Sequence, residues 1–386
     1  MGGDIPWATP DDLGRLKDNT LRATQRLITM EGYNSCGTSM APSGSLVLST
    51  RAPIGHLAIA GTDMCTNQGC RCLVFRADDD SHFFYYQLLA ARLELESLGQ
   101  GSTFKELGRG NLEGVCLATP SISEQRAIAA FLDRETGRID ALIAKKERQI
   151  ELLQEKRAAL ISHAVTNGLD PDEPMKDSGV DWLGEVPEHW CVYRSKLLFR
   201  EANDRSTTGE ETLLTVSHIT GVTRRSEKNV TMFMAESLEG YKKCEAGDLV
   251  INTMWAWMGA MGIAPERGIV SPSYNVYQFR SEENEPSFYD YLFRTGQFVA
   301  EVICHSKGVW LSRLRLYPEA FFEIRIPCPS QREQHEIVYF IQKETGNYET
   351  LQRKIEKSIE KLREYRTALI SAAVTGKIDV REELVS

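Results

Sequence analysis

Cysteine and histidine are the side chains of this sequence that are best able to hold a metal ion or to act as a nucleophile or base. The nine cysteines include Cys65, Cys70 and Cys72 close together, but these lack the paired C-x-x-C spacing of zinc sites. Burial as small apolar side chains is the more frequent role of such cysteines. The seven histidines stand singly, without an H-E-x-x-H arrangement. We therefore predict no metal site and no cofactor.

Motifs of nucleotide-dependent catalysis are also absent from the sequence. It contains no G-x-x-x-x-G-K-[ST] phosphate loop, no Asn-Pro-Pro-aromatic tetrapeptide of amino-methyltransferases and no obvious acidic and lysine cluster of nucleases. A single-chain DNA methyltransferase or nuclease is therefore a less favoured hypothesis. Cofactor-dependent methylation by the isolated chain would support it.

The charge balance argues against unaided binding to nucleic acid. The formal net charge is −9, whereas proteins that bind DNA alone are usually basic, because neutralising phosphates provides much of their affinity. Basic residues do cluster locally, at Arg224-Arg225 and at Arg313 and Arg315. The 42% of apolar and 26% of charged residues are globular values, and 386 residues suffice for two or three domains.

Three features of the sequence predict a cytoplasmic protein. An odd number of scattered cysteines fits reduced thiols better than a disulfide framework. The opening "MGGDIPWATP" has neither the basic nor the apolar region of a signal peptide. No segment approaches the ~18 uninterrupted apolar residues of a membrane helix.

A long internal repeat must position all of these residues. The phrase "AALISHAVTNGLD" at 158–170 recurs as "TALISAAVTGKID" at 367–379, and the match extends without a gap back to Pro120 and Pro329, at an offset of 209 residues. Identical pairs include Glu124/Glu333, Gln125/Gln334, Phe131/Phe340 and Arg157/Arg366. A period of half the chain indicates two copies of a domain followed by a helix, not a solenoid of short repeats.

Each copy is predicted to end in a long helix. Ser121 and Ser330, each followed three residues later by Glu, resemble capping boxes. A helix of ~42 residues would be ~63 Å long. Apolar residues recur at spacings of three, four and seven, at Ile128, Leu132, Ile139, Leu142, Ile150, Leu153 and Leu160, and again at Ile337, Ile341, Tyr348, Leu351, Ile359, Leu362 and Leu369. This stripe favours an antiparallel coiled coil of the two helices, and solvated helices held by i,i+4 ion pairs are the alternative.

The segments before the two helices also match in order. Gly44–Val47 pairs with Gly247–Val250 at an offset of 203. Phe84, Tyr85, Leu88, Ser102 and Leu107 pair with Phe288, Tyr289, Leu292, Ser306 and Leu311 at 204. "GSLVLSTRAPIGHLAIA" and "GDLVINTMWAWMGAMGIA" read as strands, and "FFYYQLLAARLELESL" and "SFYDYLFRTGQFVAEVIC" as helices whose aromatic runs pack in a core. The predicted fold class is α+β, with two α/β domains joined by the two long helices.

The ordered set of motifs resembles the specificity subunits of type I restriction-modification systems. The resemblance covers nearly the whole chain and rests on the long helical phrase from Pro120 to Asp170, its C-terminal copy, "VDWLGEVPEHW", "IPWATPDDL", "SLVLSTRAPIG" and "TNQG". It implies a non-catalytic subunit with two target-recognition domains, each reading half of a bipartite, asymmetric DNA site. The readers would lie about one turn of duplex apart, ~34 Å, with the helices as spacer.

The resemblance also implies partners and a domain division. The expected partners are double-stranded DNA, two modification subunits that carry the methyltransferase, and restriction subunits that join through the complex. The expected division is a first target-recognition domain at 1–120, a central helix at 121–167, a linker at 168–185, a second target-recognition domain at 186–329 and a C-terminal helix at 330–376.

DNA contacts are expected in loops next to the first strands and before the last strands of each domain. Arg and Lys suit guanine edges or phosphates, and Asn and Gln suit adenine. The candidates are Arg51, Asn67, Gln68, Ser102 and Lys105 in the first domain, and Asn252, Trp255, Ser273, Tyr274, Lys307 and Arg313 in the second. For each of them, a surface or loop-stabilising role is the alternative.

The two units differ at their beginnings. The second has a leading segment from Trp190 to about Glu210 before its match to "IPWATPDD", whereas the first starts almost at that match. The first recognition domain is therefore expected to be shortened. This difference supports a third hypothesis, a structural coiled-coil scaffold that has lost DNA reading.

Overall fold

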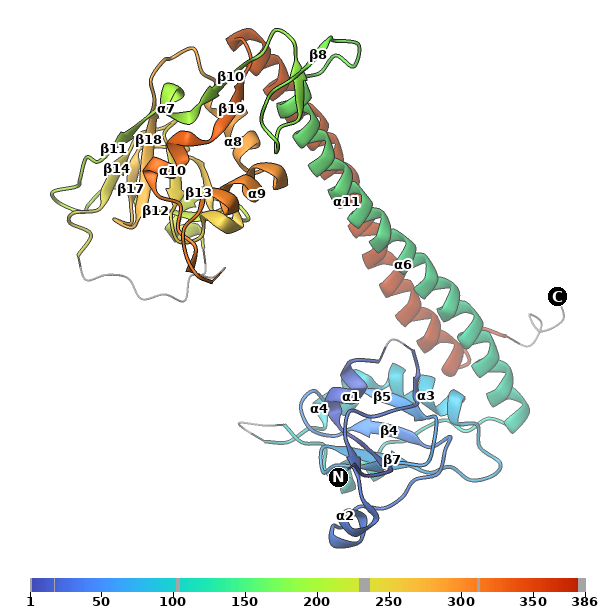
Figure 1. The fold of residues 1–386 in the computed structure, drawn as a ribbon. Coiled ribbons are helices and arrows are strands. Elements are labelled where there is room, and N and C mark those ends of the chain that lie inside the picture. The colour runs from blue at the N-terminus through green and yellow to red at the C-terminus, as the bar shows by residue number, and fades with distance from the viewer. Residues whose placement is uncertain (1, 17, 102–104, 229–236, 311–312, 381–386) are drawn as a thin grey trace. The chain divides into compact units, whose positions relative to one another are not determined.

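The computed structural model describes residues 2–16, 18–101, 105–228, 237–310 and 313–380, and over these the chain is mixed α and β (Figure 1). It divides into two compact units. Unit 1 comprises residues 1–148 and 355–386, and unit 2 comprises residues 149–354. Each unit therefore contains half of each of the two long helices. In the described part of the chain, no helix is both long and apolar enough to cross a membrane.

Unit 1 contains two small sheets. One has the strand order β2-β5-β4-β7 and the other β3-β1-β6. The strands are β1 (Ile5–Ala8), β2 (Thr20–Leu21), β3 (Leu27–Ile28), β4 (Leu46–Ser49), β5 (Leu57–Ala60), β6 (Cys65–Thr66) and β7 (Cys70–Leu73). β4 pairs antiparallel with both β5 and β7, and β4 and β5 are buried along their whole length. The predicted strand pair at 44–60 is thus present.

One of the short helices of unit 1, α3, packs on β5 of the larger sheet. The short helices are α1 (Pro10–Gly14), α2 (Met30–Ser35), α3 (Ser81–Ala90), α4 (Arg92–Ser97) and α5 (Arg109–Glu113). α3 begins after Asp80, whose side chain accepts a hydrogen bond from the Phe83 amide. The aromatic run 83–86 is buried together with residues of β4 and β5, which confirms the prediction that it packs in a core.

Unit 2 has a larger set of strands. Its main sheet has the order β11-β18-β15-β16, and the two-stranded pairs are β10-β19, β12-β13, β14-β17 and β8-β9. The bounds are β8 (Met175–Asp177), β9 (Glu185–Pro187), β10 (Cys191–Arg194), β11 (Phe199–Ala202), β12 (Leu214–Ser217), β13 (Gly221–Arg224), β14 (Lys242–Cys244), β15 (Leu249–Asn252), β16 (Met261–Ile263), β17 (Gly268–Val270), β18 (Tyr274–Phe279) and β19 (Arg325–Cys328). The segment expected as a linker, 168–185, thus carries β8 and the first residue of β9. Its apolar Leu183 is buried in the unit 2 core, as is Val186 just after it.

Two of the shorter elements of unit 2 contact this sheet, α8 at β16 and α7 at β11. The shorter helices are α7 (Ser195–Leu198), η1 (Arg225–Glu227), η2 (Ala256–Met258), α8 (Pro286–Phe293), α9 (Gly296–His305) and α10 (Pro318–Glu323). The core cluster contains Phe288 and Tyr289 of the second aromatic run, together with Trp190 and Phe199. All four side chains are fully buried.

Strand registers define which residues of the two units are equivalent. Leu46 of β4 lies opposite Ile59 and Leu73, and Leu249 of β15 lies opposite Ile263 and Tyr277. Therefore β4, β5 and β7 of unit 1 correspond to β15, β16 and β18 of unit 2. In unit 2, β11 pairs with the outer side of β18. No strand of the described residues pairs with that side of β7.

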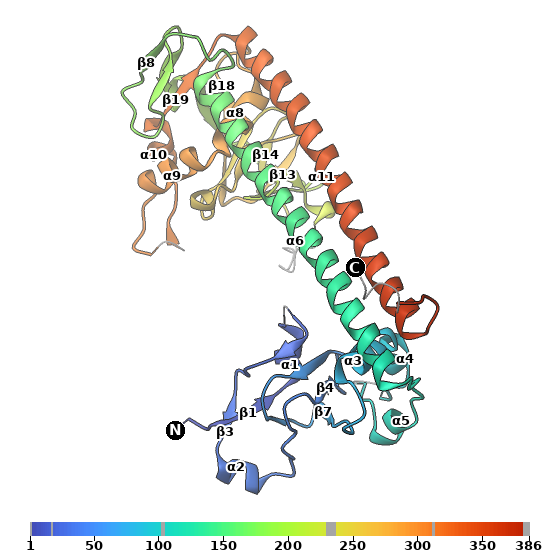
Figure 2. The same ribbon diagram turned by 90° about the vertical axis from the view of Figure 1, so that its right-hand side faces the viewer.

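The two predicted long helices are present as α6 (Ile122–Asn167) and α11 (Gln331–Val374). In both views they run side by side (Figures 1 and 2). In unit 1 the Arg366 guanidinium pairs with Asp140 at 2.9 Å, and in unit 2 Arg157 pairs with Glu349 at 3.3 Å. The second ion pair is the first one shifted by the 209-residue repeat. A second pair of unit 1 joins Arg363 to Glu147 at 3.0 Å, so the contacting positions rise along α6 as they fall along α11, and the two helices are antiparallel there.

One position of the predicted apolar stripe differs from the structure in both copies. Leu142 and Leu351 are 47% and 45% exposed, whereas Ile143 is 9% exposed. At about 100° per residue, the fourth residue after Ile139 lies about 40° from it and the third lies about 60° away on the other side. Ile143 therefore stays closer to the buried face, and Leu142 turns outward.

A buried glutamine joins each long helix to the preceding domain. In unit 1 the Gln125 carbonyl accepts from the Asp80 amide at 2.8 Å, and its amide group donates to the Pro120 carbonyl at 2.9 Å. In unit 2 Gln334 makes the same two bonds, with Glu285 and Pro329, at the same distances. Both glutamines are 1% exposed. The identical Gln pair found in the sequence is thus a structural joint.

Candidate nucleic-acid interface

In unit 2, three segments that contain the candidate DNA-contacting residues are hydrogen-bonded to one another. Two of the candidates expected in loops lie at strand ends, since Asn252 is the last residue of β15 and Tyr274 the first of β18. Residue Thr253, just after β15, donates its hydroxyl to the Ser273 carbonyl at 2.8 Å and accepts from the Leu316 amide at 3.2 Å. Lys307 and Arg315, between α9 and α10, exchange two backbone hydrogen bonds of 3.0 Å. We call the described residues 307–310 and 313–315 the basic hairpin. All six candidates of the second domain therefore lie on one frame.

These six side chains differ in how far they are exposed to solvent. Trp255 is 50% exposed, and Ser273, Lys307 and Arg313 are exposed as well. Asn252 is buried, and its carbonyl oxygen accepts from the Met254 amide at 3.2 Å, so it stabilises its own loop. Burial raises the pKa of Tyr274, which keeps its hydroxyl neutral. The exposed members are the ones that the fold presents to a ligand.

The basic hairpin also presents residues that were not selected from the sequence. Val309 is 92% exposed, Trp310 is 69% exposed and Arg315 is exposed. The Arg313 amide donates to the Trp310 carbonyl at 2.8 Å, which fixes the local turn. An exposed aromatic ring between cations suits stacking on a base or insertion at a base step. The signal was the phrase "KGVWLSRLR", in which Lys307 and Arg313 flank three apolar residues.

Unit 1 repeats the same frame. The Leu107 amide donates to the Thr50 carbonyl at 2.7 Å, as Leu316 does to Thr253, and Gln100 and Glu106 exchange two backbone bonds, as Lys307 and Arg315 do. The equivalent of Leu107 is therefore Leu316, at an offset of 209. The sequence comparison had paired it with Leu311, which lies outside the described residues, because it did not account for the longer hairpin of unit 2.

The candidates of the first domain lie around this smaller frame. The Arg51 guanidinium pairs with the Glu106 carboxylate at 3.1 Å. The two side chains are 46% and 41% exposed. The Asn67 carbonyl oxygen accepts from the Gly69 amide at 3.0 Å and stabilises its own turn. Gln68 and Lys105 are exposed. Ser102 lies outside the described residues.

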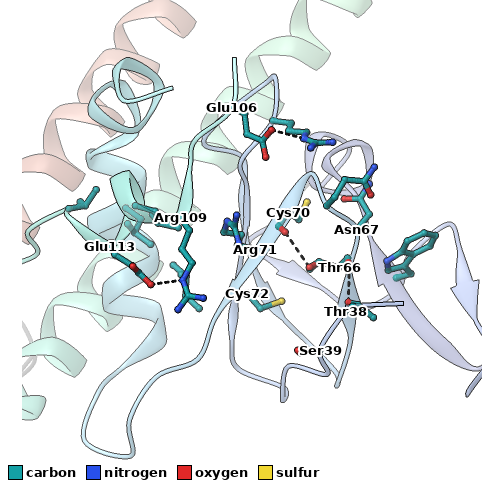
Figure 3. A pocket seen from close by; sticks show the side chains of 18 of the residues that line it. Thr38, Ser39, Thr66, Asn67, Cys70, Arg71, Cys72, Glu106, Arg109 and Glu113 are labelled. Atoms are coloured by element: carbon teal, nitrogen blue, oxygen red, sulfur yellow. Dashed lines mark hydrogen bonds and ion pairs between the residues drawn. The ribbon is translucent and has the colours of Figure 1, made fainter. Parts of the chain in front are cut away.

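A cavity of about 1010 Å³ opens beside this frame (Figure 3). Arg51, Asn67 and Gln68 line one part of it, and Arg71 lies among the other labelled side chains. Burial raises the pKa of Cys70 to about 12 and that of Cys72 to about 11, so both thiols stay protonated there. Thiolates are the form that binds metals. Across the described residues, no group of three or more potential ligands is placed to hold a metal ion.

The charges of the two frames differ at both positions of the exchanged backbone pair. Unit 2 has Lys307 and Arg315 where unit 1 has Gln100 and Glu106. Because Glu106 also neutralises Arg51, the frame of unit 1 is less positive than the basic hairpin. A polyanion would therefore be attracted more strongly to the frame of unit 2.

Known proteins share both sequence and fold with this chain. A family model described as the type I restriction modification DNA specificity domain matches residues 1–152. The type I restriction enzyme MjaIX specificity subunit of Methanocaldococcus jannaschii is 33% identical over 199 residues, which are 50% of this chain and 44% of that protein. The chain thus matches less than half the length of this relative.

Two solved structures have a similar fold. One, from a study of complex assembly and conformational transition of the type I R-M system, has a TM-score of 0.64 at 13% identity and covers 87% of this chain and 83% of that chain. The other, the HsdS subunit from Thermoanaerobacter tengcongensis, has a TM-score of 0.52 at 14% identity and covers 88% and 82%. At these identities the similarity concerns the fold.

Proposed function

We propose that this chain, whose residues 1–152 match the model of the type I restriction modification DNA specificity domain and which is similar to specificity subunits, reads DNA as a non-catalytic recognition subunit. Each unit would recognise one half of a bipartite, asymmetric site. The target-recognition domains would be residues 1–120 and 186–329. Methyltransferase and endonuclease activities would belong to the partner subunits, and the complex would act in the cytoplasm.

The observation that carries this proposal is the repeated hydrogen-bonded frame. Thr50 and Thr253 anchor the same three loop segments in the two units. Loops on a rigid scaffold are where recognition residues usually lie, because their side chains can vary without changing the fold. A duplicated scaffold with different loop side chains is what two different half-sites require.

The long helices would set the distance between the half-sites as an antiparallel coiled coil. α6 has 46 residues, which corresponds to a length of about 69 Å. The recurring pair of Arg157 with Glu349 and of Arg366 with Asp140 supports a fixed register of the two helices. Segment 168–185 would return the chain to the second domain.

The helices would also bind two modification subunits. Leu142 and Leu351 are equivalent by the repeat and are both about half exposed, so the chain offers the same apolar side chain twice. Paired sites of this kind fit two identical partners. Restriction subunits would join through the assembled complex. Partner subunits around the DNA would supply most phosphate contacts, which is compatible with a net charge of −9.

Methylation-resolved sequencing of DNA from a host that expresses this chain with its matching modification subunit tests the proposal. We expect a split motif that is methylated in both halves. Trp310→Ala should relax one half of the motif and leave the other half unchanged. Tyr339→Ala is a matched control, since Tyr339 is 70% exposed on α11, away from the basic hairpin. Co-purifying subunits without any motif would contradict DNA reading.

The Arg51–Glu106 ion pair favours a second candidate, a scaffold in which unit 1 no longer reads DNA. In that case only the half-site of unit 2 would be specified. Glu106→Gln would then leave the methylated motif unchanged, whereas a reading unit 1 would change its half-site when Arg51 loses its partner. The same sequencing experiment distinguishes the two candidates.

A further inference from the structure

The outer side of β7 in unit 1 is an edge whose equivalent in unit 2 is covered. β11 pairs with residues 276–279 of unit 2, which correspond to residues 72–75 of unit 1 by the strand register. In the described residues of unit 1, no strand takes the place of β11. An unpaired edge offers a row of backbone donors and acceptors to an added strand.

Apolar side chains flank this edge and line the cavity of about 1010 Å³. We define the β7 groove as these apolar residues together with one arginine: Arg71, Leu73, Phe75, Leu88, Leu112, Val115 and Leu117. Leu112, Val115 and Leu117 are only partly buried, whereas their equivalents Phe321, Ile324 and Ile326 are 0% exposed. These three positions are therefore fully covered by other side chains in unit 2 and only partly covered in unit 1.

In unit 2, residues 191–202 cover the positions that are equivalent to the β7 groove. The Ser195 amide and hydroxyl both donate to the Ile324 carbonyl, at 2.8 and 2.9 Å. The Phe199 ring is 0% exposed and packs on Phe279 and Phe321, with centroid distances of 4.5 and 5.8 Å. Leu198 is buried in the same cluster. A strand, a short turn of helix and a second strand thus fill this space.

Two buried donors of unit 1 have no acceptor at this cavity. Among the described residues, Arg71 Nε and Trp7 Nε1 are buried atoms without a hydrogen-bond partner, and both residues line the cavity. Arg71 is equivalent to Asn275 by the register. In unit 2 a carboxylate lies nearby, because Lys242 bonds to Asn275 at 3.1 Å and lies 4.0 Å from Glu201 of β11. A buried unpaired donor is costly, so an acidic side chain from an added strand would complement Arg71.

We propose that the β7 groove binds an extended segment of a separate polypeptide chain, one that carries the same kind of segment as residues 191–202. Its Leu-Phe pair would fill the apolar groove, and an acidic residue two positions after the Phe would pair with Arg71. The segment at 191–202 is not available, because its Ser195, Leu198 and Phe199 are buried in unit 2 and its strands β10 and β11 pair there with β19 and β18. The occupant that we propose is therefore another copy of this kind of segment. This proposal does not depend on DNA reading.

Titration of the full chain with a fluorescent peptide tests the proposal. The peptide copies residues 190–203, "WCVYRSKLLFREAN", and is kept reduced. We expect saturable binding, together with slower deuterium exchange at 72–75 and 115–119. A peptide with Phe199→Asp should bind at least about tenfold more weakly, because it loses the buried ring. A peptide with Glu201→Gln should also bind more weakly. Both peptide comparisons leave the protein unchanged.

A protein variant then locates the site. Leu117→Glu places a charge in the β7 groove and should abolish binding, whereas Leu93→Glu, at a residue 79% exposed on α4, should not affect it. Circular dichroism verifies that both variants fold. Equal binding of a scrambled peptide, or unchanged binding by Leu117→Glu, would overturn the proposal.

A fused segment distinguishes the source of the occupant. In this arm, a second copy of residues 190–203 is joined ahead of residue 2 by a flexible linker. A fused copy that protects 72–75 and 115–119 while the free peptide at millimolar concentration does not bind would exclude donation by a separate chain. Binding of the free peptide supports it.

Discussion

At the scale of single residues, the buried glutamines Gln125 and Gln334 link the start of a domain helix to the start of a long helix in each unit. Each satisfies one amide at the start of a domain helix and one carbonyl before a long helix. A buried polar group that loses its partner costs more free energy than the hydrogen bond itself contributes. These joints therefore hold the long helices to their domains.

Removing one of these joints should destabilise the chain. Gln334→Ala leaves the Glu285 amide and the Pro329 carbonyl without partners, and we expect the free energy of unfolding of unit 2 to fall by about 2–4 kcal/mol. Chemical denaturation followed by tryptophan fluorescence measures it. Gln331→Ala is the control, because Gln331 is exposed at the start of the same helix and should change stability little. Equal effects of the two substitutions would contradict the assigned role.

His189 should make unit 2 sensitive to pH. Its imidazole lies 2.9 Å from one Glu333 oxygen and 3.1 Å from Glu173, and the hydrogen bond to Glu333 raises its pKa above 6.5. A raised histidine pKa stabilises the fold below about pH 6.5, and this contribution is lost as the pH rises through the folded-state value. Because the side chain is half exposed, the effect should be at most about 1 kcal/mol.

The measurement compares His189→Gln with the unaltered chain by urea unfolding at pH 5.5 and 8.5. The difference in unfolding free energy should be larger at pH 5.5. His163→Gln, which removes an exposed histidine of α6, is the matched control for loss of an imidazole. A larger difference at pH 8.5 would reverse the expected sign.

Loop polar residues show what the sequence could not reveal at this scale. Asn67 and Asn252 were both expected in loops, but only Asn67 lies in one, whereas Asn252 is the last residue of β15. The side-chain carbonyl oxygens of both accept backbone amides of the turns that follow them. Whether an asparagine side chain accepts a hydrogen bond from a nearby backbone amide depends on the backbone conformation of its turn. The residue type alone does not specify that conformation. The aromatic run at 83–86 could be predicted, because burial follows directly from apolarity.

At the scale of elements, the basic hairpin should determine the salt dependence of DNA binding. Arg313→Ala and Arg315→Ala, in the complex with modification subunits, should each reduce the slope of log affinity against log salt concentration by about 1 if each contacts a phosphate. Fluorescence anisotropy at several salt concentrations measures the slope. Arg267→Ala removes an exposed arginine elsewhere in unit 2 and should leave the slope unchanged. A uniform change in all three variants would indicate a nonspecific charge effect.

The helices were the elements most predictable from the sequence. Capping signals and the long apolar period pointed to both, and α6 and α11 begin within a residue of the predicted serines. The outward turn of Leu142 and Leu351 was not foreseen, because a stripe counted at three and four residues does not distinguish Leu142 from Ile143. The hairpin lengths were also missed, since a two-residue insertion there leaves the flanking matches intact.

At the scale of the whole molecule, helix length should control the spacing of the recognised half-sites. We propose inserting seven helix-forming residues after Arg148 and seven more after Lys357, positions that face each other in the antiparallel register of the two ion pairs. Seven residues add about 10.5 Å of helix, or about three base pairs. Methylation-resolved sequencing should show the split motif with a spacer longer by about that number.

An insertion in α6 alone is the control. It shifts Arg157 and Asp140 out of register with Glu349 and Arg366, so we expect a lower melting temperature and no methylated motif. An unchanged spacer after the double insertion would show that the helices do not measure the site.

The repeat predicted two similar domains, but it could not predict how the helices are shared between the two units. That sharing depends on contacts such as Arg366 with Asp140, which are more than 200 residues apart in the chain. Local patterns carry no information about partners at that distance.

The division of the chain has a consequence for its synthesis on the ribosome. Unit 2 is a continuous stretch, residues 149–354, whereas the core of unit 1 includes Ile370, Ala373, Val374 and Val380 from the end of the chain. Domains normally fold in the order in which they emerge. Here the core of unit 1, which is translated first, can be completed only when residues 370–380 have been synthesised. Unit 2 can therefore fold while unit 1 still exposes apolar surface to chaperones.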